Sequence, residues 1–235
     1  MNALPVSDVV VLVSANAEWR AVEKILPRAE LRDSPLGKWF VMPDHSCPCP
    51  VLFFHGGWGK IAAAASTQYV IHHCRPKLLV NLGTCGGFKG EVQRGDVILA
   101  ERTLVYDIHE LMGDHDEHIA HYSTDIDLSW LTAPLPHQVT RARIISADRD
   151  LAAQEIPRLK REFGAIVADW ESASIAWVAR RHGVRTLILR GVSDLVGQDG
   201  GEAYDGKLHV FEQNTEHVMR AMIDALPAWI ALAAP

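Results

Sequence analysis

The chain has 235 residues, 48% of them hydrophobic and 22% charged, with a formal net charge of −6, which is an ordinary globular composition. The negative charge argues against nucleic acid as the main partner, because phosphate backbones are held by clustered Lys and Arg side chains. With no apolar run of about twenty residues and no basic leader at its start, the sequence predicts no membrane span and a cytosolic protein.

The first half of the chain predicts an alternation of strands and helices. An uncharged, β-branched run predicts a strand at Val9–Val13, and an apolar stripe predicts a helix over Ala17–Leu26 that ends at Pro27. Further strands are predicted at Lys38–Met42, Val51–Phe54 and Leu78–Leu82, an Ala-rich helix at Ile61–Cys74, and a glycine-rich turn at Gly83–Gly87.

The second half continues the alternation. Strands are predicted at Val97–Ala100, Arg143–Ser146, Ile166–Asp169 and Thr186–Val192, with helices at Ser172–His182 and from Phe211 to Ala225 or beyond. Strands that alternate with helices indicate an α/β fold, here one domain over residues 1–235 with a mixed, mostly parallel central sheet flanked by helices. Ligands in such folds bind beyond the carboxyl ends of strands. We therefore expect the irregular stretches 107–138 and 197–208 to form walls of a site.

Several segments resemble ligand-binding motifs and fail on inspection. The run from His55 to Lys60 lacks the first Gly and the final Ser or Thr of a phosphate-binding loop, and Gly83–Gly87 lacks the third Gly of a dinucleotide fingerprint. Cys47 and Cys49 have no second Cys pair at zinc-ligand spacing. The histidines at positions 109, 115, 118 and 121 lie among acidic residues, which favours a solvated polar loop. We predict no metal ion and no cofactor.

Three acidic residues that are distant in sequence each follow a predicted strand. Glu18 comes after the first strand, Glu171 after the penultimate one, and Asp194 after the last. Each could serve only as a helix cap or first-turn residue. Their coincidence at strand ends favours a shared site.

Five segments carry a resemblance to a known family. They are Val51–Ala64, Leu79–Phe88, Arg94–Leu99, Asp169–Ala176 and Arg190–Asp194. In this order they resemble the nucleoside phosphorylase superfamily, which includes 5′-methylthioadenosine/S-adenosylhomocysteine nucleosidase and bacterial purine nucleoside phosphorylase. The nucleosidases are the nearer match, and the family is dimeric or larger.

The resemblance implies roles for individual residues. Glu18 is expected to position and activate water, Glu171 to bind the ribose hydroxyls, and Asp194, oriented by Ser193, to protonate the departing base. Trp170 would pack against the sugar, and Leu151 would offer its backbone to the base edge. Thr84, Cys85 and Gly86 would lie near the ribose and the nucleophile.

The attacking group is expected to be water rather than phosphate. Asn81 stands where the family's phosphorylases have Arg, and a phosphate dianion calls for such a cation. The sequence therefore predicts a nucleosidase that hydrolyses the N-glycosidic bond of a purine-type nucleoside. A phosphate-dependent phosphorylase and a non-catalytic nucleoside-binding protein are the alternatives.

Two departures from the family's pattern leave the particular nucleoside open. Asp150 lies near the position of an aromatic residue that stacks on adenine in the nucleosidases, and Asp107–Tyr122 is rich in His and acid where they are apolar. The resemblance also implies a homodimer, with the segment after Tyr106 as the candidate for closing a neighbour's pocket.

Overall fold

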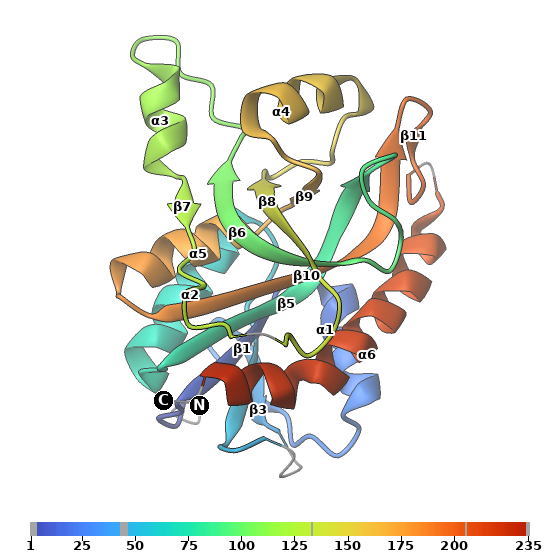
Figure 1. The fold of residues 1–235 in the computed structure, drawn as a ribbon. Coiled ribbons are helices and arrows are strands. Elements are labelled where there is room, and N and C mark those ends of the chain that lie inside the picture. Colours follow the sequence, from blue (N-terminus) through green and yellow to red (C-terminus); the bar gives the residue numbers. More distant parts are fainter. Residues whose placement is uncertain (1–3, 43–46, 133, 205, 234–235) are drawn as a thin grey trace.

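The strands assemble into one mixed sheet that helices cover on both faces (Figure 1). The structure, a computed structural model, describes residues 4–42, 47–132, 134–204 and 206–233. Both ends of the described chain lie on the same side of the molecule, beside the amino ends of the central strands (Figure 1).

The described elements follow the predicted order, with additions. The strands are β1 (Val9–Val13), β2 (Arg32–Ser34), β3 (Gly37–Val41), β4 (Val51–His55), β5 (Leu78–Phe88), β6 (Val97–Val105), β7 (Thr124–Asp125), β8 (Thr140–Ser146), β9 (Val167–Asp169), β10 (Arg185–Gly197) and β11 (Gly200–Gly201). The helices are α1 (Asn16–Ile25), α2 (Lys60–Cys74), α3 (His115–His121), α4 (Ile156–Phe163), α5 (Ser172–Arg181) and α6 (Leu208–Ala233), with a 3-10 turn η1 (Ala153–Glu155). Among the described helices, none is long and apolar enough to cross a membrane.

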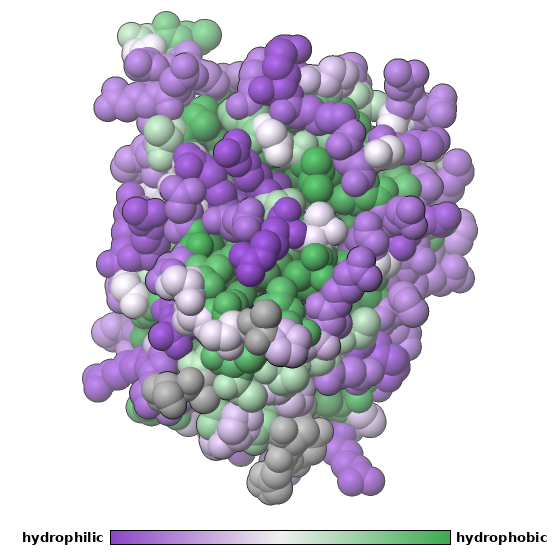
Figure 2. All heavy atoms as spheres, viewed as in Figure 1, coloured by the Kyte–Doolittle hydropathy of each residue, from purple (hydrophilic) through white to green (hydrophobic). Residues whose placement is uncertain are grey.

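The core has two layers because β1 is buried on both faces. Its side chains alternate in direction, so Val9, Val11 and Val13 pack with α1 and α6, whereas Val10 and Leu12 pack with α2 and α5. The chain between β7 and β8 crosses the sheet in front of β5 (Figure 1), where its hydrophobic side chains pack against the first of these layers. On this face hydrophobic side chains gather toward the middle and hydrophilic ones surround them (Figure 2).

The central strands close into a ring. The parallel ladder of β5 with β10 is the longest, from the pair Leu78–Arg185 to the pair Phe88–Val196. β10 then pairs with β6, β6 with β8, β8 with β9, and β9 returns to β5. The antiparallel pairings are shorter, which agrees with the mixed, mostly parallel sheet that the sequence predicts. The carboxyl ends of strands from both halves of the chain are thereby brought around one space.

The prediction of a glycine-rich turn at Gly83–Gly87 is wrong. These residues continue β5, where Gly83 pairs with Arg190, and Gly86 and Gly87 also pair with β9. The glycines serve close packing rather than a reversal of the chain: a Cβ on Gly87 would meet the Val92 side chain at 2.5 Å. The prediction failed because a glycine-rich run gives the same signal in a turn and in a tightly packed strand.

Two short helices were not predicted. α3 lies in the His-rich segment expected to be a loop, and the Asp114 side chain caps it by accepting hydrogen bonds from the amides of Asp116 and Glu117. α4 begins at Ile156, has Pro157 in its first turn, and ends at Gly164 in the left-handed conformation. Short polar helices lack the long apolar stripe on which a prediction depends.

Candidate active site

A cavity of about 650 Å³ opens at the carboxyl ends of β1, β5, β9 and β10. All nine site residues proposed from the sequence line it: Glu18, Thr84, Cys85, Gly86, Leu151, Trp170, Glu171, Ser193 and Asp194. Aromatic side chains that the sequence did not single out complete the wall, among them Trp58, Tyr204 and Phe211. Residues from distant parts of the chain therefore share one space, as the strand-end argument requires.

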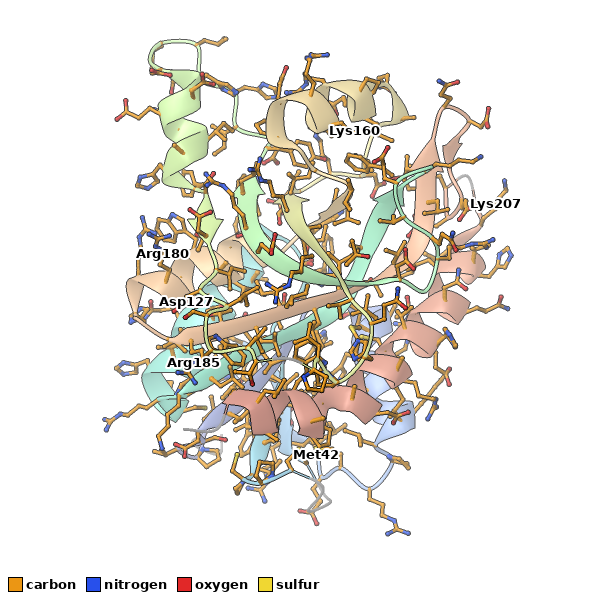
Figure 3. The ribbon with its side chains drawn as sticks, viewed as in Figure 1. Met42, Asp127, Lys160, Arg180, Arg185 and Lys207 are labelled. Atoms are coloured by element: carbon orange, nitrogen blue, oxygen red, sulfur yellow. The ribbon has the colours of Figure 1, made fainter. Side chains whose placement is uncertain are left out.

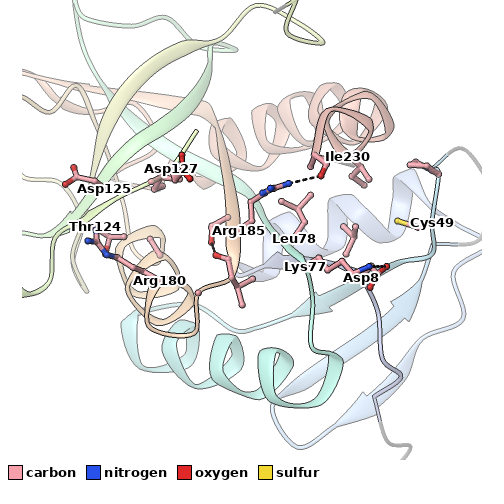
Figure 4. Close-up of a pocket in the computed structure, with 18 residues that line it drawn as sticks. Asp8, Cys49, Lys77, Leu78, Thr124, Asp125, Asp127, Arg180, Arg185 and Ile230 are labelled. Carbon is pink, nitrogen blue, oxygen red and sulfur yellow. Dashed lines mark hydrogen bonds and ion pairs between the residues drawn. The ribbon is translucent and has the colours of Figure 1, made fainter. Parts of the chain in front are cut away.

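A second cavity, of about 1040 Å³, lies at the opposite, amino ends of β1, β5 and β10 (Figure 4). Its charged side chains are largely taken up by neighbours: Lys77 pairs with Asp8 at 3.0 Å, and Arg185 donates to the Ala233 carbonyl at 2.8 Å. Figure 3 shows Arg185, at the start of β10, and Lys207, just before α6, on opposite sides of the molecule. None of the residues proposed from the sequence lines this cavity, so the smaller one is the candidate site.

Glu18 is fixed by three hydrogen bonds at the start of α1. Its Oε1 accepts from the Thr84 amide at 2.6 Å and the Thr84 hydroxyl at 2.9 Å, and its Oε2 accepts from the Ala15 amide at 3.0 Å. The side chain is 2% exposed. A carboxylate offers about four lone-pair positions. This arrangement leaves an acceptor position on Oε2 for a further donor, such as a water molecule.

One buried arginine serves three buried carboxylates. Arg190, on β10, is fully buried, with Nε 2.9 Å from Asp169 Oδ2, Nη1 3.5 Å from Glu18 Oε1, and Nη2 3.5 Å from Glu171 Oε2. Burial by itself lowers the pKa of Arg190, but the three carboxylates outweigh it and raise that pKa. A single guanidinium can neutralise only one carboxylate, and it is shared by three carboxyl groups. The cluster is therefore electron-rich and attracts positive charge.

Asp169 and Ser172 hold the guanidinium in place, and the sequence assigned neither of them a role. The Ser172 hydroxyl contacts Asp169 and accepts from Arg190 Nε at 2.8 Å. Asp169 also accepts from the Ser146 hydroxyl at 2.5 Å, and Asn81 lies 3.4 Å from Ser172 Oγ. The signal available in the sequence was the position of these two polar residues at the junction of a predicted strand and a predicted helix.

Glu171 is oriented by the start of α2. Its Oε1 accepts from the Gly59 amide at 3.0 Å, at the amino end of the helix dipole. Burial raises the pKa of Glu171; the Arg190 charge opposes this, and the Asp169 and Glu18 carboxylates add to it. Beside it, the ring of Trp170 meets that of Trp58 edge-on at 5.8 Å. A hydrogen-bonding carboxyl group thus lies next to an aromatic wall.

A bulge in β10 presents Ser193 and Asp194 to the cavity. Val192 pairs with Cys85 and Asp194 with Gly86, so Ser193 is the extra residue that re-aims its neighbour. Its hydroxyl donates to Asp194 Oδ1 at 2.7 Å. Burial raises the pKa of Asp194, the Ser193 hydrogen bond lowers it in part, and the Glu202 and Asp150 carboxylates raise it further. The environment favours the protonated acid.

The remaining predicted residues contribute backbone and packing. Cys85 is buried with its thiol 3.8 Å from the Gly191 carbonyl, and burial raises the pKa of this thiol well above its usual value. A neutral buried thiol is not a nucleophile. The Leu151 carbonyl accepts a hydrogen bond from the Tyr204 hydroxyl at 3.0 Å.

Histidine and cysteine clusters do not gather into a metal site within the described ranges. No group of three or more His, Cys, Asp or Glu residues in them is arranged to hold a metal ion. Cys47 and Cys49 are half-buried and are not joined by a disulfide bond. In the His-rich segment, the His118 ring faces Glu110, with Nδ1 3.5 Å from Oε2.

Comparison with known proteins places this geometry in a family. A model of the phosphorylase superfamily matches residues 48–227. A 5′-methylthioadenosine/S-adenosylhomocysteine nucleosidase of Tolumonas auensis is 24% identical over 75% of this chain and 82% of that protein, and one of Oceanobacillus iheyensis is 26% identical over 74% and 80%. The chain belongs to the phosphorylase superfamily.

Solved structures agree at the level of the fold. A 5′-methylthioadenosine nucleosidase of Arabidopsis thaliana superposes with a TM-score of 0.76 at 24% identity, covering 98% of this chain and 97% of that one. A mutant futalosine hydrolase of Helicobacter pylori gives a TM-score of 0.70 at 15% identity, covering 95% and 100%. The nucleoside phosphorylase-like α/β fold predicted from the sequence is thus confirmed.

Proposed function

We propose that the protein is a purine nucleosidase, which cleaves the N-glycosidic bond with water and releases the free base and the sugar. The matched relatives are themselves 5′-methylthioadenosine/S-adenosylhomocysteine nucleosidases. The 5′ substituent of the substrate is left open. The distribution of charge around the cavity is the observation that carries the choice of water.

The described lining residues of the cavity favour a neutral nucleophile over a phosphate dianion. Five carboxyl groups line it, from Glu18, Asp150, Asp169, Glu171 and Asp194, against one cationic side chain among the described lining residues. That cation, Arg149, is paired with Glu155 at 2.7 Å. The other nearby cation, the buried Arg190, is shared among three carboxyl groups. A dianion would meet no unpaired cationic side chain among the described lining residues and would lie beside the buried Glu18 and Asp169 carboxyl groups, so a neutral nucleophile is favoured.

Asp194 would act as the general acid. A purine is a poor leaving group as an anion, and a proton delivered to its ring accelerates its departure by a factor of roughly 10²–10⁴. An aspartic acid can do this near neutral pH only if its pKa is raised, and burial raises the pKa of Asp194. The Ser193 hydroxyl, 2.7 Å away, fixes its orientation.

The other two acids would act on the sugar and the water. As the base departs, the sugar becomes an oxocarbenium-like cation, which the carboxylates around Arg190 stabilise. Glu171 would bind the sugar hydroxyls, and Glu18 would hold the water with its open acceptor position and take its proton. Acid and base on opposite sides of one bond give a single displacement with inversion.

The test is a panel of purine nucleosides assayed for free base with and without phosphate. We expect release that phosphate does not accelerate, with free sugar rather than sugar 1-phosphate as the co-product. Strict dependence on phosphate would instead establish a phosphorylase. Tight nucleoside binding without release would establish a non-catalytic binding protein.

We further propose a homodimer. The side chain of Trp58 lines the cavity yet is 60% exposed, and nearby Ile61 on α2 is 85% exposed. Leu111 and Met112, ahead of α3, are 96% and 98% exposed. Light scattering after gel filtration should give twice the chain mass, and Ile61→Glu should shift it toward the monomer and raise KM. A monomeric wild type of full activity would refute this proposal.

A further inference from the structure

We propose that Tyr204 is the residue against which the heterocycle of the substrate packs. The family's nucleosidases stack an aromatic residue on the base from the chain after β8, where this protein has Asp150. The inference rests on the proposed function, since it concerns the base subsite of the same cavity. A ring from a different loop, the one that follows β11, would supply the missing platform.

Two contacts hold the Tyr204 ring at the cavity. Its hydroxyl donates to the Leu151 carbonyl at 3.0 Å, which ties the loop after β11 to the loop after β8. Its amide donates to the Gly201 carbonyl at 3.1 Å, so the chain turns back and lays the ring against Gly201. A Cβ on Gly201 would come within 2.6 Å of the ring. The ring is therefore held at both its hydroxyl and its backbone, and it still lines the cavity.

The loop that carries Tyr204 runs beside the strand that carries Asp194. Gly201 pairs with Val196, and the Glu202 amide donates to the Leu195 carbonyl at 3.0 Å, so the chain that leads to Tyr204 starts next to the residue that follows Asp194. Burial raises the pKa of Tyr204, and the Asp150 and Asp194 carboxylates raise it further. The phenol stays protonated and can donate to Leu151 throughout the range in which the enzyme would work. Asp194 and Tyr204 line the same cavity, so a base that accepts a proton from Asp194 can pack against the Tyr204 ring.

The rest of the base subsite contains no described aromatic residue in the loop after β8. Leu151 is apolar, and Asp150 and Arg149 are charged, so none of the three offers an aromatic face to a purine. Trp58 and Trp170 pack against each other beside Glu171, which is the sugar side of the cavity. Tyr204 instead donates a hydrogen bond to Leu151, whose backbone is expected to face the edge of the base.

The test compares Tyr204→Leu with the wild type by the inhibition constants of the two products. Stacking of a base on an aromatic ring contributes roughly 5- to 150-fold to affinity. We expect adenine or hypoxanthine to bind at least ~10-fold more weakly to the variant, while ribose binds as before. Tyr204→Phe keeps the ring and loses one hydrogen bond, so a loss of about 5-fold is expected.

Gly201→Ala provides an independent variant, because it retains the tyrosine and displaces its ring. It should weaken base binding as Tyr204→Leu does. Tyr69→Leu makes the same chemical change on α2, outside the cavity, and should leave both constants unchanged. Calorimetry with the free base gives the same comparison if the wild type cleaves no nucleoside, so failure of the proposed function is a separate result.

Unchanged affinity for the base in Tyr204→Leu would overturn the inference. So would an equal loss of base and ribose binding together with a lowered Tm, which is the signature of a merely structural residue.

Discussion

Replacing Asp194 with Asn removes the proton that the mechanism delivers and little else. The amide has nearly the size of the acid, and its oxygen can still accept the 2.7 Å hydrogen bond from Ser193. General acids contribute roughly 10²–10⁴-fold, or about 2.7–5.5 kcal/mol in the barrier. We expect kcat to fall by that factor while KM changes only a few-fold, because the cavity keeps its shape.

The assay follows release of free base from a purine nucleoside. A second substrate, p-nitrophenyl riboside, separates acid catalysis from damage, because nitrophenolate leaves without a proton. On that substrate the loss in Asp194→Asn should be less than about 10-fold, since general acid assistance is no longer required. Asp199→Asn is the matched control: its carboxylate lies in the same hairpin and is 93% exposed. A kcat for Asp194→Asn within 10-fold of the wild type on the purine nucleoside would refute the reasoning.

Further predictions concern pH, Glu18 and the buried Arg190. Activity should fall as pH rises through the raised pKa of Asp194, and Glu202→Gln, which removes a carboxylate that raises this pKa, should move that fall to lower pH in a pH–rate profile. Asp194→Asn should also be more stable than the wild type to urea at neutral pH, and no more stable below pH ~4, because a raised folded-state pKa costs stability only once the unfolded carboxyl ionises. Glu18→Gln places an amide donor against the Ala15 amide that now donates to it, so kcat should drop at least ~100-fold; single-turnover rates equal to wild type would contradict this. Arg190→Met leaves buried carboxylates unpaired and should cost about 3–5 kcal/mol in urea unfolding, less at acid pH; an unchanged midpoint would mean that the cluster is not ionised.

The buried strands were the most predictable part of the fold. Val9–Val13 is apolar throughout because β1 is covered on both faces, and a short β-branched run of this kind is readily recognised as a buried strand. β10 was predicted only to Val192, because Ser193 and Asp194 look like the polar residues that end a strand. They continue it because a bulge turns them into the cavity, an effect of pairing with β5 that no local pattern contains.

Among the site residues, those placed by strand ends could be anticipated, and those placed by packing could not. Glu18, Glu171 and Asp194 line one cavity, as the sequence suggested, while their chemical roles stay predictions. Arg190 was visible in the sequence, but its function as shared counter-ion depends on three contacts between distant segments. Tyr204 lies in the stretch 197–208 that the sequence expects to form a wall of the site, but no local pattern singles out this residue, because the stretch has no periodicity. The cytosolic location also stays a prediction from the sequence.

The close packing around Gly83 limits which substitutions this position can accept. A methyl group there would come within 1.9 Å of Arg190 Nη1 and 2.8 Å of Glu18 Oε1. The hydrogen atom at this position is thus what gives the guanidinium room to sit between its acids. Even the smallest substitution, Gly83→Ala, would therefore displace the Arg190 guanidinium. We expect it to abolish activity although every acidic residue of the site is retained.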